Sequence, residues 1–165
     1  ASRKRLNIHY ECADAAEFEM GDTYDAAYSF FDSLNNILDA DQLQRAFIQV
    51  AKHIKPGGSF IFDVNTAYAF ETQLFDQEDL KQRSKLKYKW NGDWDPEKRI
   101  ITVNMKFWRN GEEFTETHRQ RAYTDEELIG MLVQAGFKDI QRFHSYTLNP
   151  PRFKSDRLHY TAIKA

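Results

Sequence analysis

The sequence is poor in cysteine and in closely spaced glycines. Cys12 is the only cysteine among the 165 residues, which excludes an internal disulfide framework and a multi-cysteine zinc site. None of the seven glycines forms a G-x-G pair. A dinucleotide fingerprint, a Walker loop and a hydrolase nucleophile elbow all require closely spaced glycines around a specified partner. These three classes of site are therefore disfavoured.

Long apolar runs and a strong excess of one charge are also absent. No apolar run approaches the roughly 18 residues of a membrane span, and the basic start at Arg3 to Arg5 is not followed by an apolar signal core. Lys and Arg total 23 against 25 Asp and Glu, a net charge of −2. Such a balance does not favour nucleic acid as a partner. The five histidines show no H-x-x-x-H spacing, so we predict no metal site. We expect a cytoplasmic protein that binds neither membrane nor nucleic acid.

The first half of the chain alternates between predicted strands and a helix. With 41% hydrophobic residues, the chain can bury a core and form one domain over 1–165. We predict strands at Asn7 to Cys12, Ala26 to Phe31 and Phe60 to Val64. A stripe of apolar residues at helical spacing predicts a helix over Asp41 to Ile54, ended by Pro56-Gly57-Gly58. Strands joined by a helical crossover indicate a parallel α/β sheet.

The middle of the chain has a different period. Between residues 85 and 123, apolar and polar residues alternate, which is typical of half-exposed antiparallel strands. Asn110-Gly111 predicts a tight hairpin turn within this stretch. A capping box at Thr124 then predicts a helix that Gly136 ends, and two more strands follow near 140–146 and 158–163. We therefore predict an α/β core formed by 1–84 and 124–165, with 85–123 as an inserted antiparallel β meander.

Polar residues follow each of the three predicted strands of the first half. Asp14, the Phe31 to Asn35 segment and Asn65 each come after a strand, where open α/β sheets bind their ligands. Turn and helix-cap chemistry is the alternative explanation for Asp32, Ser33 and Asn65.

A second group of polar residues lies in the predicted meander. Glu116, His118 and Arg121 share one short strand. They are candidates for a binding site, and the alternative is that they form the solvated face of that strand.

The order of these motifs resembles a known family. Ala13-Asp14 after a strand, Tyr24-Asp25 leading into a strand that ends in Phe31 to Asn35, and Lys55 to Gly58 before Phe60 to Val64 are similar to class I S-adenosylmethionine-dependent methyltransferases. The closer similarity is to a bacterial small-molecule branch with a strand insertion. That branch shares Glu116-x-His118-x-x-Arg121 and a helix ending in Ala135-Gly136-Phe137.

The resemblance implies S-adenosylmethionine as cofactor and a small molecule as substrate. It implies that Asp14 accepts the adenine amino group, that Ala15 contacts the ring through its backbone, and that Phe30 or Phe31 lies beside the methyl donor. It places substrate near a set of polar residues: Asp32, Ser33, Asn35, Asn65 and Arg121. His118 is the candidate catalytic base, because a histidine side chain exchanges protons near neutral pH.

The same resemblance exposes a gap in the motif order. The family's first strand with its Gly-rich loop, and the second strand that ends in an acid, have no counterpart in the 165 residues. We therefore expect a truncated or split methyltransferase, of which this chain is the carboxyl-terminal portion, and poor cofactor binding by the chain alone. The alternative is a non-catalytic interaction module, or half of a two-chain site, that has lost cofactor binding. An open sheet edge would then favour pairing between Asn7 to Cys12 and Ala26 to Phe31, or a homodimer.

Overall fold

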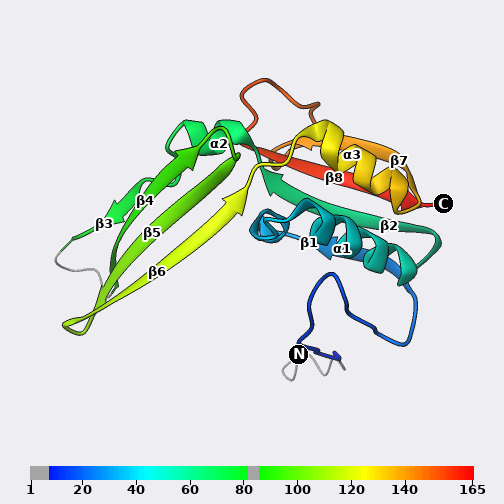
Figure 1. Ribbon diagram of the computed structural model, residues 1–165, viewed down its shortest axis with the longest axis horizontal. Helices are drawn as coiled ribbons and strands as arrows, with labels where there is room; N and C mark the ends of the chain where they lie inside the picture. The colour runs from blue at the N-terminus through cyan, green and yellow to red at the C-terminus, as the bar shows by residue number, and fades with distance from the viewer. Residues whose placement is uncertain (1–7, 82–85) are drawn as a thin grey trace.

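The computed structural model describes residues 8–81 and 86–165, and it forms two four-stranded sheets. The first sheet has the order β1-β2-β8-β7 and is built from β1 (Tyr24–Ser29), β2 (Ile54–Asn65), β7 (Phe137–His144) and β8 (Arg157–Lys164). The second has the order β3-β4-β5-β6 and is built from β3 (Gln77–Asp79), β4 (Lys87–Asp95), β5 (Ile100–Arg109) and β6 (Glu112–Arg121). Figure 1 shows the second sheet projecting away from the end of β2. The predicted mixed α/β fold with an antiparallel β meander is confirmed.

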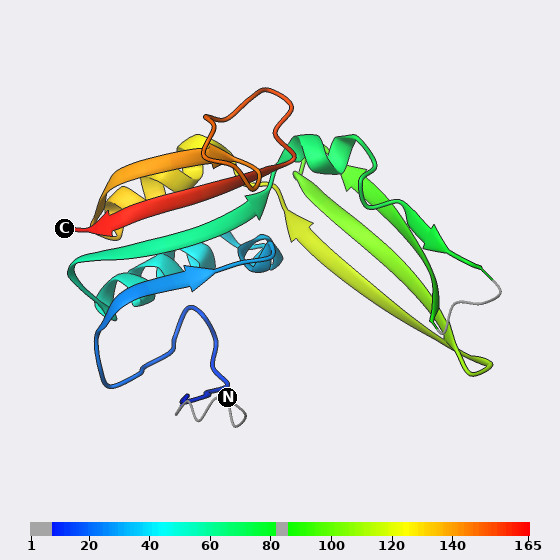
Figure 2. The ribbon, with the colours of Figure 1, turned by 180° about the vertical axis from the view of Figure 1, so that it is seen from behind.

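The helices α1 (Ala40–Lys52) and α3 (Asp125–Gln134) cover one face of the first sheet. They lie in front of the strands in Figure 1 and behind them in Figure 2. Asp39 caps α1 by accepting from the Gln42 amide, and Thr124 and Glu127 form the predicted capping box of α3. Gly136, with φ of +88°, ends α3 in the left-handed conformation that glycine adopts without strain.

The main core lies between these two helices and the first sheet. Its largest members are aromatic side chains that are 2% exposed or less: Phe47, Phe60, Phe62 and Tyr160. The Phe62 ring is stacked on the Tyr160 ring at a centroid distance of 4.9 Å, and the Phe47 ring meets Phe62 at 5.4 Å. These contacts join α1 to both central strands. They hold the carboxyl-terminal half of β2 against α1 and β8.

The second sheet has a smaller core, which the short helix α2 (Ala67–Glu71) helps to cover. Its buried residues are Ala69, Phe70, Ile101, Val103 and Ala122. The β5-β6 hairpin turns at Asn110 and Gly111 with φ of +54° and +84°, so the predicted turn with two positive φ angles is confirmed.

The parallel sheet differs from the prediction in three places. β1 and β2 are parallel, but residues 8–12 of the predicted Asn7 to Cys12 strand form no strand and pair with no other segment in the described chain; Asn7 itself lies outside the described residues. Direct pairing of that segment with β1 is therefore wrong. The continuous apolar run Ala26 to Phe31 is typical of a strand covered on both faces, but Tyr28 in β1 is 75% exposed, so β1 is covered on one face only.

The Lys55 to Gly58 motif is the third difference. It lies inside β2, not in a turn, because α1 already ends at Lys52 and β2 begins at Ile54. A Cβ added at Gly58 would lie 2.6 Å from the Asp25 backbone oxygen, so glycine permits β1 to approach β2 closely there. Within residues 8–81 and 86–165, no helix combines the length and the hydropathy that a bilayer crossing requires.

Candidate functional site

Two cavities open beside the carboxyl ends of β1 and β2. The first, called the inter-sheet cavity, measures about 580 Å³ and is lined by residues of both sheets: Asp32, Asn65, Ala69, Leu74, Phe75, Gln77, Trp90, Val103, Met105, Phe107, Glu116, His118, Gln120, Asp156 and Arg157. The second, called the aromatic cavity, measures about 470 Å³ and is lined by Phe30, Phe31, Ile61, Asp63, Phe143, Ser145, Tyr146, Thr147, Leu148, His159 and Thr161. The turn that follows β1 supplies residues to both cavities.

This turn has an unusual backbone. Phe31 and Asp32 have φ of +61° and +50°, a conformation that is costly for residues with a Cβ atom and that is found preferentially at functional sites. The Asp32 carbonyl accepts from the Asn35 amide at 3.0 Å. Its carboxylate accepts from the Gln120 side chain at 2.5 Å and from Arg157 at 2.8 Å. Residues from β6 and β8 therefore hold the turn in place.

Arg157 connects the two acidic residues at this edge. Its guanidinium forms ion pairs with Asp32 and with Asp63, which is 1% exposed. Burial alone would lower the pKa of Arg157, but hydrogen bonds to the two carboxylates outweigh that effect and raise it. The charge of Arg157 is thus matched within the protein. Among the residues that the structure describes, the buried Oδ1 atom of Asp63 has no hydrogen-bond partner.

Asn35 holds three segments together at the same edge. Its side-chain amide donates to the backbone oxygens of Asn65 at 3.0 Å and Arg121 at 2.9 Å, and its Oδ1 accepts from the Asn65 amide at 2.9 Å. Asn35 is completely buried and is not among the residues that line either cavity. Asn65 does line the inter-sheet cavity, and its side chain donates to Gln120 at 3.2 Å.

One face of β6 points into the inter-sheet cavity. Glu116, His118 and Gln120 alternate along the strand and all three line the cavity. The Nε2 atom of His118 lies 3.0 Å from the Glu116 carboxylate, and both side chains are about half exposed. His118, the candidate base of the sequence analysis, thus lines the inter-sheet cavity together with Asp32 and Asn65.

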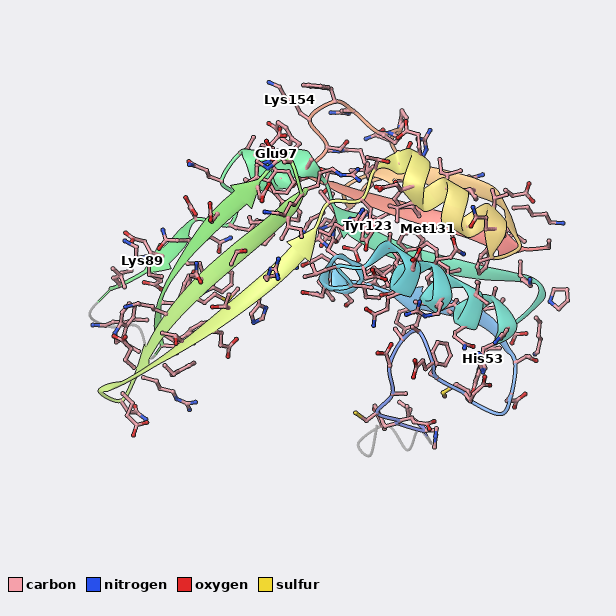
Figure 3. All side chains as sticks on the ribbon, in the orientation of Figure 1. His53, Lys89, Glu97, Tyr123, Met131 and Lys154 are labelled. Atoms are coloured by element: carbon pink, nitrogen blue, oxygen red, sulfur yellow. The ribbon has the colours of Figure 1, made fainter. Side chains whose placement is uncertain are left out.

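Arg121 lies at the end of the same strand but contacts a different region. Its guanidinium donates to the Leu38 carbonyl at 3.1 Å and to Glu127 at 3.3 Å, and it stacks over the Tyr123 ring. Burial would raise the pKa of Glu127, but hydrogen bonds from Arg99 and the Thr124 amide outweigh it and lower the pKa. Figure 3 labels Tyr123 at the junction of the two sheets, where burial raises its pKa to about 12. Arg121 is not among the residues that line the inter-sheet cavity.

Asp14 and Ala15 lie in a turn beside the first turn of α1. The Asp14 carboxylate accepts from the Ala16 amide at 2.7 Å and from the Gln42 side chain at 3.3 Å. Asp14 and Ala15 are exposed, so groups of a ligand could reach them. Ser33 follows Asp32, and its hydroxyl donates to the Phe30 carbonyl at 2.8 Å.

Sequence reasoning missed Gln120, Arg157 and Trp90. Gln120 could have been found from the sequence, because it continues the alternation of Glu116 and His118. Trp90 lies in the alternating stretch that predicted the meander, but alternation did not show which face lines a cavity. Arg157 gave no such signal, since it reaches the site only through the pairing of β8 with β2. In the part of the chain that the structure describes, no three His, Cys, Asp or Glu residues gather to hold a metal ion.

No family model matches the chain. Two curated proteins are similar in sequence. A putative methyltransferase of Bacillus subtilis, YqeM, is 29% identical over 147 residues, which cover 86% of this chain and 59% of that protein. A putative methyltransferase of a Geobacillus strain is 23% identical and covers 99% of this chain and 68% of that protein. The chain thus spans about three fifths of the length of the Bacillus subtilis relative.

Solved structures show the same fold. An S-adenosylmethionine-dependent methyltransferase from Clostridium acetobutylicum has a TM-score of 0.87 at 24% identity, covering 99% of this chain and 68% of that one. The sugar N-methyltransferase KedS8 from a Streptoalloteichus species has a TM-score of 0.76 at 17% identity, covering 99% and 65%. The fold is therefore that of class I S-adenosylmethionine-dependent methyltransferases. Together with the two sequence relatives, this confirms the resemblance found in the motifs and S-adenosylmethionine as the cofactor of proteins with this fold.

Proposed function

We propose that this chain forms part of an enzyme that transfers a methyl group from S-adenosylmethionine to a small molecule. The observation that carries the proposal is the turn at Phe31 and Asp32, which ends β1 and adjoins the cavity lined by His118. Methyl transfer is an in-line displacement, so the protein mainly aligns the two reactants. A rigid turn between a donor site and an acceptor cavity provides such alignment.

The residues of the donor side fit the nucleoside part of the cofactor. Asp14 has an exposed carboxylate that can accept from the adenine amino group, and Ala15 offers its backbone beside it. Phe30 and Phe31, 40% and 76% exposed, offer apolar surface next to the turn. The cofactor supplies a methyl group activated by a sulfonium. The chain's own residues position it.

The residues of the acceptor side divide into two roles. His118 and Asn65 line the cavity and can contact substrate, with His118 as the group that takes a proton. Asp32 also lines the cavity, but Gln120 and Arg157 already bind its carboxylate, so it acts by holding the turn. Ser33, Asn35 and Arg121 bind other parts of the protein, which supports the same role for them.

Titration calorimetry with S-adenosylhomocysteine tests the donor site. We expect the chain alone to bind in the range of about 0.1–10 millimolar, because losing two hydrogen bonds to charged groups weakens a micromolar site roughly 10²- to 10⁴-fold. Fusion to the unmatched portion of the Bacillus subtilis relative should restore tight binding, and Asp14→Ala should abolish it again. The control is Asp22→Ala, because Asp22 is an exposed carboxylate that accepts from the next amide and lines neither of the two cavities. A fusion that binds no cofactor would refute the proposal.

The second candidate function is half of a two-chain site, or an interaction module without catalysis. It is favoured by β1, which pairs only with β2 in the described residues and presents its other edge to solvent beside the exposed Tyr28 and Phe31. An exposed strand edge recruits another strand, so we propose a homodimer or a second polypeptide at β1. Sedimentation that shows only a monomer, together with cofactor binding by the chain alone, would refute this candidate.

The proposed cellular location is the cytoplasm. Cys12, the one cysteine of the sequence, is exposed and unpaired, which suits a reducing compartment. Fractionation of cells that produce the protein tests this proposal, and recovery from an oxidising compartment would contradict it.

A further inference from the structure

The segment that carries Asp14 and Ala15 is attached to α1 at two points, one near the start of the helix and one just after its end. Near the start, the Gln42 side chain donates to the Asp14 carboxylate at 3.3 Å. At the other end, His53 caps α1 and contacts the part of the segment that leads toward β1. Figure 3 labels His53 beside this end of the helix. Ala16, between the two attachments, is only 3% exposed.

The attachment at His53 depends on the protonation of its ring. The Met20 amide donates to Nε2 of His53 at 3.1 Å, and the Phe18 ring lies against the imidazole at a centroid distance of 4.7 Å. The Nδ1 atom lies 2.8 Å from the Gln49 carbonyl oxygen. Because a carbonyl can only accept and a backbone amide can only donate, Nδ1 carries the proton and Nε2 is the acceptor. The hydrogen bond from Met20 therefore exists only while the ring is neutral.

The charged groups around the ring do not replace this hydrogen bond when Nε2 takes up a proton. The Glu19 carboxylate lies 3.4 Å from Nε2, but its side chain is 72% exposed, and an ion pair with such a carboxylate contributes little. Lys52 precedes His53 at the end of α1, and Lys55 follows it and forms an ion pair with β1. A second proton on the ring thus removes the acceptor of the Met20 amide and gives only a weak contact in exchange.

We propose that His53 is a positioning residue for the cofactor, which holds the Asp14 segment in place when its ring is neutral and loosens it when the ring is protonated. Asp14 lies six residues before Met20, in a stretch of turn and loop, so the attachment at Met20 restricts the positions that the Asp14 carboxylate can take. Preorganised groups bind a ligand more tightly. The effect on cofactor rests on the proposed methyl transfer, but the pH-dependent attachment of the segment does not.

Nuclear magnetic resonance of the chain alone tests the attachment without cofactor. Between about pH 8 and about pH 5, where histidine side chains titrate, we expect the Met20 amide and the His53 ring resonances to shift with a common midpoint. The amides of Asp14 and Ala15 should follow them. His53→Gln keeps an acceptor that takes no proton, so the same amides should not titrate in that variant. The matched control is His9→Gln, which removes an exposed histidine of the same amino-terminal stretch and should leave the Met20 shift unchanged.

Calorimetry with S-adenosylhomocysteine on the fused protein tests the effect on cofactor. From about pH 8 to about pH 5, the affinity of the wild type should fall about two- to tenfold, the worth of one hydrogen bond. His53→Gln should bind equally well at both pH values. His53→Phe keeps a ring against Phe18 but offers no acceptor, so it should bind weakly at both. A role of His53 in packing alone predicts neither the pH profile nor its loss in His53→Gln.

The outcomes separate this inference from the proposed function. A Met20 amide that does not titrate with His53, a pH dependence that persists in His53→Gln, or wild-type affinity in His53→Phe would overturn the inference. If circular dichroism shows that His53→Phe does not fold, the wild type and His53→Gln decide the question. A fused protein that binds no S-adenosylhomocysteine at any pH, while Met20 titrates as expected, would refute the proposed function and leave the attachment at His53 supported.

Discussion

The two sheets of this protein divide stability and recognition between them. The first sheet buries a continuous aromatic and aliphatic core under α1 and α3. The second has a smaller apolar core, in which Ile101 and Val103 pack with Ala69 and Phe70 of α2, and the Glu116, His118 and Gln120 side of β6 lines a cavity. Packing density sets the cost of a substitution, because a well-packed site cannot collapse around a missing side chain. The comparison shows how the well-packed first sheet can support the second sheet, whose polar side chains remain accessible to a ligand.

The largest expected effect comes from the core of the first sheet. Phe62→Ala should lower the free energy of unfolding by about 3–5 kcal/mol, since the Phe62 ring is fully buried against Phe47 and Tyr160. Ile101→Ala in the second core should cost about 2 kcal/mol, at the low end for such a change. Urea denaturation followed by circular dichroism measures both. Equal losses in the two variants would contradict the division between the sheets.

The charged cluster that joins β8 to the turn after β1 comes next. Arg157→Met should cost about 3 kcal/mol, because it leaves the carboxylate of Asp63 buried without its ion-pair partner. The double variant Arg157→Met with Asp63→Leu should recover part of that loss. If the double variant is less stable than the single one in urea, the cost does not come from the uncompensated charge.

The hairpin of the second sheet should show a smaller effect. Gly111→Ala places a Cβ at φ of +84° and should cost about 1–2 kcal/mol through backbone strain alone, since no atom lies within 4 Å of the added group. Gly130→Ala in α3 is the control, and it should stabilise the protein by about 0.5–1 kcal/mol, because that glycine lies in a helix interior with open space. Thermal unfolding of both variants measures the difference in stability. A loss of stability in both variants would indicate that packing of the added methyl group, and not backbone strain, causes the effect.

The junction between the sheets should give the smallest effect, and it depends on pH. Hydrogen bonds from Arg99 and from the Thr124 amide lower the pKa of Glu127 in the folded protein. The ionised carboxylate therefore adds to the free energy of unfolding at any pH above the usual pKa of a glutamate, and this contribution is lost as the pH falls through the lowered pKa. Glu127→Gln should therefore cost about 1 kcal/mol at neutral pH. The difference from the wild type should vanish in strong acid. Urea titrations at several pH values measure the difference in free energy of unfolding between the two proteins. A difference that grows as the pH falls would contradict the lowered pKa of Glu127.

Local signals in the sequence determined most of the secondary structure. The apolar stripe of α1, the capping box at Thr124 and the turn at Asn110-Gly111 each act through residues a few positions apart, so a single sequence reveals them. The motif order after β1 also indicated the methyltransferase fold, and it placed Phe31, Asp32 and Asn65 at the edge where the cavities open. Glu116, His118 and Gln120 line the same cavity because alternation along a strand fixes which residues share a face.

Contacts between distant segments decided the rest. Residues 8–12 alternate like a strand, but in the described chain no neighbouring strand pairs with them, and alternation cannot supply a partner. Asn35 was a candidate for substrate binding by its position, and only the fold shows its amide bound to the backbones of Asn65 and Arg121. Arg157 lies 125 residues from Asp32 in sequence, and the pairing of β8 with β2 brings them together. The sequence determined the faces of the elements, whereas tertiary packing determined which polar groups were already satisfied and which could still bind a ligand.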